Sequence, residues 1–329
     1  MATVNPIVPS AGPVAGSRSF LSRLGDGDEI ARLITFLFAA TVVLITVLLV
    51  YELWVNSTLP RHKFGLNFFV TQVWDPVTDE YGALPFIFGT VMTSTIALLL
   101  AVPLGIGASI FLAELAPARV SDTLQFFIDL LAAVPSVIYG ILGVFIVVPL
   151  MRTVIYPALN KPFGYLPIFK GPSYGVGFLT AGIVLAIMVI PYIISVSREV
   201  LLSVPRDQRE AALALGSTRW ESTWKVVVPF AKTGIMGSIF LALARALGET
   251  MAVTMVIGNT PKISASLFSA GDTIASVIAN QFTEATGDLY LQSLVGLGLV
   301  LFLLTFILNG LARLLIVLTT QKGSGVVNR

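Results

Sequence analysis

Two full charges, Arg245 and Glu249, stand four residues apart in an otherwise apolar stretch between Lys232 and Lys262. A charge near the middle of a membrane-length segment costs at least about 2.5–3.5 kcal/mol, and such residues usually face a cavity and mark a pathway. A spacing of four predicts that both side chains lie on one face of a single helix. A guanidinium keeps its proton and makes two parallel hydrogen bonds to an oxyanion. The pair therefore predicts a site through which an anion passes, and an ion pair that only locks the helix bundle is the alternative.

Glu249 has a predicted role of its own in this pair. It is expected to hold Arg245 while the site is empty, which lowers the cost of an unpaired buried charge. It should also oppose permanent capture of an anion, because a transport site must bind weakly enough to release.

The chain has few residues that could catalyse a reaction or bind a metal. The chain has no cysteine and one histidine, His62, so thiolate chemistry is excluded and a metal site lacks donors. The ATP-binding pattern G-x4-G-K-[ST] does not occur, and neither do G-x-S-x-G and H-E-x-x-H. A net charge of +2 is too small to indicate a nucleic-acid partner. We therefore expect no catalytic residue, no metal and no cofactor in this chain.

The composition indicates an all-α membrane protein. Hydrophobic residues make up 56% of the 329 residues and charged residues only 12%, whereas soluble domains carry about 25% charged residues. A spanning helix needs about 20 mostly apolar residues. Apolar runs of this length predict six transmembrane helices at about 31–55, 84–113, 126–151, 176–200, 233–258 and 289–316. Asp129 is expected to open the third of them as a helix cap.

Lysine and arginine placement predicts the orientation. With the N-terminus inside, the inner segments hold 13 of these residues and the outer loops hold 6, which fits the excess of positive charge in cytoplasmic loops. Both termini are then cytoplasmic, with loops near 56–80, 152–170 and 259–288 outside. Residues 1–29 are expected to form a disordered cytoplasmic tail, and residues 321–329 a short cytoplasmic C-terminal tail.

One inner loop, residues 203–230, carries a motif. It reads Glu210-Ala211-Ala212, then Gly216 after three residues, then Val226-Val227-Val228-Pro229 after nine more. This resembles the EAA loop of ABC importer permeases, with valines in the two aliphatic positions. The resemblance implies a type I ABC importer permease fold. It also implies a short coupling helix beginning at Glu210, a sharp turn at Gly216 and a second helix that together dock on a separate ATPase.

Two further stretches narrow the resemblance. Residues 242–253 read ALARALGETMAV and residues 129–140 read DLLAAVPSVIYG. With the EAA-like loop they resemble the PstC family, the permease subunits of the bacterial high-affinity phosphate importer, over about residues 30–318. The family's transmembrane arginine and glutamate map onto Arg245 and Glu249. The resemblance implies a homologous permease subunit (PstA-like), two ATPase subunits that bind ATP and magnesium (PstB-like), and an external phosphate-binding protein (PstS-like).

The expected function is therefore that of a cell-membrane permease subunit that imports phosphate and hydrolyses no ATP itself. A permease for another oxyanion, sulfate or molybdate, is the nearest alternative, because arginine alone does not separate these ligands. A phosphate-sensing membrane scaffold is a second alternative, although it would need no ATPase-binding loop. A carrier driven by an ion gradient would predict inverted repeats, and none is seen.

Overall fold

The computed structural model describes residues 28–171 and 174–324, which are almost entirely helical. The chain divides into two units, Met1–Glu52 and Leu53–Arg329. Six described helices are long and apolar enough to cross a membrane, which confirms the expected fold class. They cover Ile30–Val55, Leu84–Leu115, Ser136–Phe163, Phe178–Leu202, Arg219–Leu247 and Asp288–Leu314.

The first unit is described through helix α2, Asp28–Val55. Its threonines suit an apolar environment, because the hydroxyls of Thr35, Thr41 and Thr46 donate to backbone carbonyls four residues earlier at 2.8–2.9 Å. No hydroxyl of these three therefore needs a partner outside the helix. Residues 28 and 29 are helical, so the predicted tail of 1–29 ends two residues too late, and the rest of it lies outside the described residues.

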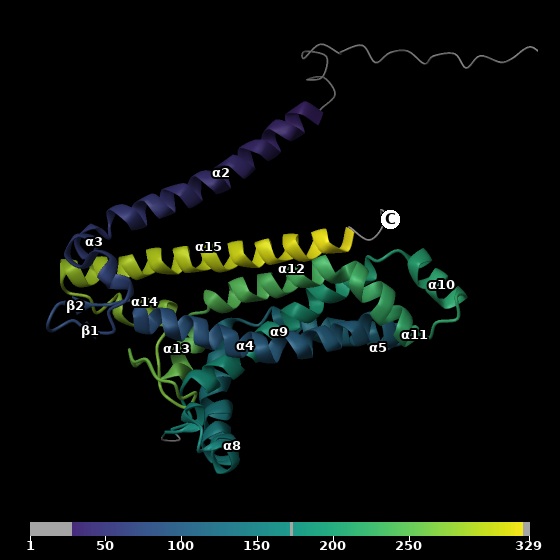
Figure 1. Ribbon diagram of the computed structural model, residues 1–329. Helices are drawn as coiled ribbons and strands as arrows, with labels where there is room; N and C mark the ends of the chain where they lie inside the picture. The colour runs from purple at the N-terminus through teal and green to yellow at the C-terminus, as the bar shows by residue number, and fades with distance from the viewer. Residues whose placement is uncertain (1–27, 172–173, 325–329) are drawn as a thin grey trace, which may run out of the picture. The chain divides into compact units, whose positions relative to one another are not determined.

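The second unit begins with a short helix and a hairpin and continues as a helical bundle (Figure 1). Its first half contains α3 (Thr58–Phe64), the 3-10 helix η2 (Gly65–Phe69), β1 (Trp74–Asp75), β2 (Glu80–Tyr81), α4 (Leu84–Ile110), the π-helix η3 (Phe111–Leu115), α5 (Ala118–Ala132), α6 (Ser136–Leu142), η4 (Gly143–Val147), α7 (Val148–Leu150), η5 (Met151–Ile155) and α8 (Tyr156–Phe163). Its second half contains η6 (Pro167–Phe169), α9 (Phe178–Leu202), α10 (Arg206–Ala214), α11 (Arg219–Ser222), η7 (Thr223–Val227), α12 (Val228–Leu247), α13 (Met251–Ile257), α14 (Ile274–Gln281) and α15 (Asp288–Ser324).

Helices α4 and α9 form the centre of the bundle, packed along most of their length. Glycines allow the two backbones to approach closely. A Cβ at Gly105 would lie 2.7 Å from a methyl of Ile193, and one at Gly182 would lie 2.4 Å from a methyl of Ile96. Such close packing makes α4 and α9 one rigid pair.

The loops predicted to be external contact one another at the end of the unit opposite α10 (Figure 1). In the β1–β2 hairpin Trp74 pairs with Tyr81, and the Trp74 indole N–H donates to Gln281 Oε1 at 2.8 Å. Tyr156 of α8 stacks on Phe268 with ring centroids 4.2 Å apart. The segments 56–80, 152–170 and 259–288 therefore share one side of the bundle, as the predicted topology requires.

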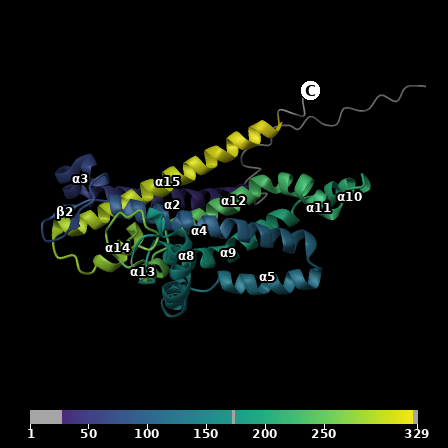
Figure 2. The same ribbon diagram turned by 60° about the horizontal axis from the view of Figure 1, so that its bottom comes forward.

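The third span differs from its prediction. The apolar run suggested 126–151, whereas the membrane-length helix covers Ser136–Phe163. Asp129 lies on the separate helix α5, which runs alongside α9 (Figure 2). Pro135 separates α5 from α6, because proline has no N–H to donate and disfavours the helical conformation in Val134 before it. Counting apolar residues does not detect such a backbone break.

The fifth span is also interrupted. The prediction was one helix over 233–258, but α12 ends at Leu247 and α13 begins at Met251. Gly248, which has a high entropic cost inside a helix, lies in the break. At the other end of the chain α15 continues to Ser324, so four residues of the predicted C-terminal tail are helical and 325–329 lie outside the described residues.

Candidate substrate pathway and coupling surface

The two interrupted spans meet each other. Helix α6, which follows the first break, packs against α13, which follows the second. The contact is close, because a Cβ at Gly140 would lie 2.5 Å from Met255 Sδ and 3.2 Å from Ala252 Cα. Tyr139 closes the first break by donating its hydroxyl to Leu131 O at 2.8 Å. Interrupted helices that face each other inside a bundle are the usual framework of a transport site.

Arg245 lies in the last turn of α12, directly before the second break, and is half-buried. Its guanidinium carbon lies 5.6 Å from the ring centroid of Tyr192 on α9, a cation–π contact. Helices α9 and α12 therefore bring an arginine and a tyrosine together beside the break.

The predicted pairing of Arg245 with Glu249 does not occur. The two residues do not share a helix face, because the helix ends at Leu247 between them. Among the described residues, none of the ion pairs includes either side chain. Glu249 Oε1 instead accepts the Ala252 N–H at 3.2 Å and satisfies a free backbone group at the start of α13. Arg245 is thus a half-buried cation whose guanidinium is bound to no carboxylate of the residues that the structure describes.

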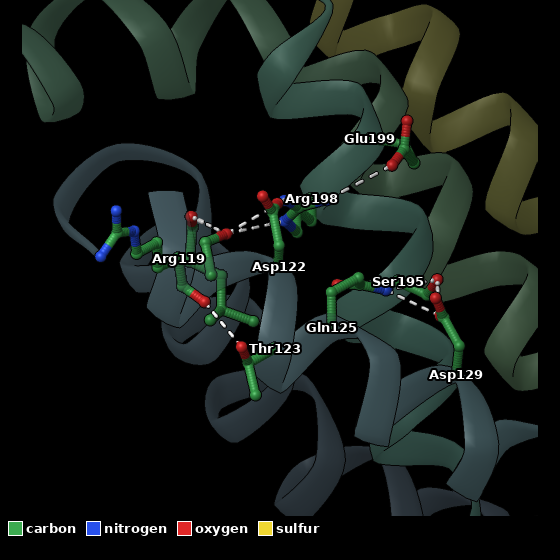
Figure 3. Close-up of polar contacts among 10 residues, drawn as sticks. Arg119, Asp122, Thr123, Gln125, Asp129, Ser195, Arg198 and Glu199 are labelled. Carbon is green, nitrogen blue, oxygen red and sulfur yellow. Dashed lines mark hydrogen bonds and ion pairs between the residues drawn. The ribbon is translucent and has the colours of Figure 1, made fainter. Parts of the chain in front are cut away.

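A second polar group lies between α5 and α9 (Figure 3). Asp129 Oδ1 accepts the Gln125 amide at 2.7 Å and the Ser195 hydroxyl at 2.8 Å. Ser195 lies one helical turn after Tyr192, so this group continues the α9 face that meets Arg245. The predicted role of Asp129 as the cap of a spanning helix is therefore wrong; it links two helices.

Arg198 ties the same two helices together one turn further along α9 (Figure 3). Its Nη2 donates to Ser121 Oγ at 3.0 Å and lies 3.2 Å from Asp122 Oδ1. The sequence analysis missed this contact. Arg198 ends an apolar run and is separated from Ser121 by 77 positions, so only the fold reveals the partner.

The EAA-like loop forms a helix, a turn and a second helix at one end of the bundle (Figure 1). The coupling helix α10 begins at Arg206, four residues earlier than predicted, and Glu210 lies exposed within it. Pro205 precedes the helix and its carbonyl accepts the Gln208 N–H, which sets the start. Gly216 has φ +87°, a left-handed conformation that favours glycine.

The second helix of the loop begins with a capping box. Thr218 Oγ1 accepts the Glu221 N–H, and the Glu221 carboxylate accepts the Thr218 N–H. Pro229 follows at the start of α12, where its missing N–H costs little. A cavity of about 320 Å³ lies between α10 and η7, with Ala211 and Ala212 in its lining. The small side chains of the motif therefore leave a hollow beside the exposed Glu210.

The described residues hold no group of three or more histidine, cysteine, aspartate or glutamate side chains suited to a metal ion. The polar groups described above bond to neighbouring helices and to backbone groups.

Comparisons with known proteins agree with this arrangement. Residues 105–317 match the family described as binding-protein-dependent transport system inner membrane component. The fold resembles that of a chain in the crystal structure of a bacterial ABC transporter involved in the import of the acidic polysaccharide alginate, with a TM-score of 0.58, 16% identity, and coverage of 88% of this chain and 98% of that one. The chain therefore belongs to this family of ABC importer permeases and is a multi-pass membrane protein.

The similar curated proteins are more specific. The chain is 48% identical to the phosphate transport system permease protein PstC of Mesorhizobium japonicum, over 83% of this chain and 86% of the relative. It is 47% identical to the protein of the same name from Pasteurella multocida, over 88% of this chain and 92% of the relative. This chain thus resembles permease proteins rather than enzymes.

Proposed function

We propose that this chain is the permease subunit of an ATP-driven importer that moves inorganic phosphate into the cell. The observation that carries the proposal is the likeness to PstC proteins over more than four fifths of the chain. Arg245 supports it from chemistry, because a half-buried guanidinium without a carboxylate partner can offer two parallel hydrogen bonds to phosphate. Neither sulfate nor molybdate is favoured by any feature of the site.

The energy for import is expected to come from partner ATPase subunits that bind ATP and magnesium. The exposed Glu210, the small Ala211 and Ala212 and the hollow beside them offer α10 as the docking surface. We infer that α10 and both termini are cytoplasmic, because the partner ATPases bind ATP inside the cell. A homologous PstA-like permease would complete the pathway, two PstB-like ATPases would drive it, and a PstS-like binding protein would deliver phosphate from outside.

We propose separate roles for the two charges, because Glu249 bonds to the start of α13. Arg245 attracts the anion, and Glu249 shapes the break by capping α13, at 3.2 Å from the Ala252 N–H. Tyr192 covers the guanidinium and reduces its exposure while no anion is bound. A cation–π contact holds a cation more weakly than a buried carboxylate does, so an arriving phosphate displaces little.

Uptake measurements in a strain that lacks its own phosphate importer test the proposal. The chain and its partner subunits are expressed together, and the uptake of phosphate, sulfate and molybdate is compared. We expect ATP-dependent uptake of phosphate and no uptake of the other two. Accumulation of sulfate or molybdate in place of phosphate would assign the chain to another oxyanion. A phosphate response without accumulation would assign it to sensing.

A further inference from the structure

The coupling helix α10 lies on the surface of the bundle. Of its nine residues only Arg209 and Ala212 are half-buried, and the others are exposed. Apart from its chain connections, α10 packs against α11 and η7, which lead into α12. The side chain of Arg209 makes the contact of α10 with the central pair α4 and α9. A force on α10 can therefore reach this pair through Arg209.

Arg209 forms a fork-shaped ion pair with Glu114, at the end of the π-helix that extends α4. Arg209 Nη2 lies 2.7 Å from Glu114 Oε1, and Arg209 Nε lies 3.2 Å from both carboxylate oxygens. The side chains are only 20% and 9% exposed. Nη2 also donates to Leu201 O at 2.7 Å, and Nη1 donates to Val204 O. One guanidinium therefore joins α10 to the ends of both α4 and α9.

Stability alone is a weak reason for this contact. Burying two charges costs several kcal/mol per ion before their attraction returns it, and well-packed apolar side chains often replace such pairs without loss. A bidentate pair differs from an apolar contact in fixing direction and distance, because the planar guanidinium and carboxylate must stay aligned. The ion pair therefore resists sliding of one helix over the other, which two apolar surfaces would permit.

We propose that the Arg209–Glu114 ion pair is the joint through which displacement of the coupling helix moves α4 and α9. The proposal rests on the proposed function, in which a partner ATPase moves α10. Since α4 and α9 are tightly packed, a shift applied at their shared end is carried along both helices. The other route runs through α11 and η7 into α12, which also packs against α4 and α9 through apolar side chains. The joint adds a polar contact of fixed direction to this apolar packing, so that one movement of α10 reaches Tyr192 on α9 together with Arg245 on α12.

Polar contacts continue from the joint into the bundle. In η3, two residues before Glu114, Leu112 O accepts the Ser121 hydroxyl at 2.8 Å. Ser121 in turn accepts Arg198 of α9, within the α5–α9 group of Figure 3. Helix α5 is therefore bound to the same end of α4 and α9 and should move with them. The break at Pro135, which follows α5, should then move as well.

The test replaces the joint without leaving a buried charge behind. The double variant Arg209→Met with Glu114→Met is reconstituted with the partner permease, the ATPases and the binding protein, and phosphate transported per ATP hydrolysed is measured. We expect an assembled complex that still hydrolyses ATP, with that ratio lowered on the order of tenfold, which corresponds to about 1.4 kcal/mol. Arg209→Lys, which keeps the charge and loses the fork, should fall between. Arg313→Met removes an exposed arginine of α15, outside the EAA-like loop, and should keep the wild-type ratio.

Charge reversal adds a second criterion. Arg209→Glu with Glu114→Arg restores opposite charges but cannot donate to Leu201 O and Val204 O from position 209, so the ratio should stay low. A wild-type ratio in the double methionine variant would overturn the proposal. Loss of assembled complex with an unchanged ratio in what remains would also overturn it, because the pair would then be a structural clamp.

A distance measurement covers the case in which the variants fail to assemble. Since the native chain has no cysteine, spin labels can be placed at Leu213 on α10 and Phe111 on η3, which are both exposed. In the wild-type complex we expect the same distance without nucleotide and with ATP bound. A change approaching one helical turn, about 5.4 Å, would show that α10 slides over α4 and would overturn the joint. If the wild-type complex accumulates no phosphate, the proposed function fails, while this measurement still tests the joint.

Discussion

Replacing Arg245 with glutamine separates a transport role from a structural one, because no ion pair is lost. The contact that disappears is the one with the Tyr192 ring at 5.6 Å, and a cation–π contact is worth about 0.5–2 kcal/mol. The change also removes a charge from a membrane span, which relieves about 2.5–3.5 kcal/mol. The relief is larger than the loss, so Arg245→Gln should assemble at least as well as the wild-type protein. Breaking a buried ion pair would instead cost about 3–5 kcal/mol.

Phosphate uptake should respond very differently. A hydrogen bond to a charged group contributes about 1.5–3 kcal/mol, so its loss should lower uptake about 10- to 100-fold. The assay is initial phosphate uptake divided by the amount of assembled complex. Arg313→Gln, which removes an exposed arginine of α15, is the matched control and should transport normally. Wild-type uptake per complex in Arg245→Gln would refute the pathway role, and a large loss of complex would refute the unpaired geometry.

Three further predictions follow from other parts of the chain. Gly216→Val should weaken ATPase association and abolish uptake, because φ is +87° and a side chain there costs roughly 1–2 kcal/mol in backbone strain. The subunit should stay in the membrane, because the space around Gly216 is open and the new side chain meets no clash. Gly216→Asn should retain activity, and normal uptake by the valine variant would exclude a coupling role. A cysteine at Ser217 should react with an impermeant thiol reagent only after permeabilisation, whereas one at the exposed Tyr165 should react from outside; the reverse pattern would invert the topology. Burial raises the pKa of Asp272, in the loop between α13 and α14, from 3.8 to about 6. The folded state therefore binds the proton more tightly than the unfolded state, so the stability of the wild-type protein falls as pH rises from about 4 to 6. Above pH 6, Asp272→Asn should be more stable than the wild-type protein by on the order of 3 kcal/mol. Its melting temperature should therefore be higher. If Asp272→Asn and the wild-type protein melt at the same temperature at pH 7 as well as at pH 4, the raised pKa of Asp272 is refuted.

The sequence was sufficient where composition or a fixed motif determines the structure. Apolar runs predicted six membrane-length helices because a bilayer demands long uncharged segments. The resemblance of residues 210–229 to the EAA loop implied a helix and a glycine turn, and Gly216 does adopt a left-handed conformation. The start of α10 was missed, because the carbonyl of Pro205 already initiates the helix before the motif begins.

The interruptions could not be predicted by counting apolar residues. Val134-Pro135 lies within an uncharged run, and Gly248 lies within an apolar stretch broken only by Arg245 and Glu249, so hydropathy joins segments that the backbone separates. Each break changed the expected role of one residue. Asp129 moved from a helix cap to a helix-linking group, and Glu249 moved from a partner of Arg245 to a cap of α13. The i,i+4 argument was sound for a continuous helix and failed because Leu247 ends the helix.

Long-range polar partners explain why the coupling route was also missed. Arg209 lies 95 positions from Glu114, and nothing in either neighbourhood indicates the other. In the folded chain these contacts form a series from α10 into the bundle. Arg209 joins α10 to α4 and α9, and Arg198 joins α9 to α5. Tyr192 of α9 then contacts Arg245 of α12. The buried arginines thus lie at the helix junctions through which a cytoplasmic movement would have to pass. Of the three arginines in this series, Arg245 is the one whose side chain has no bond to an oxygen among the described residues, as expected if its partner is the transported anion.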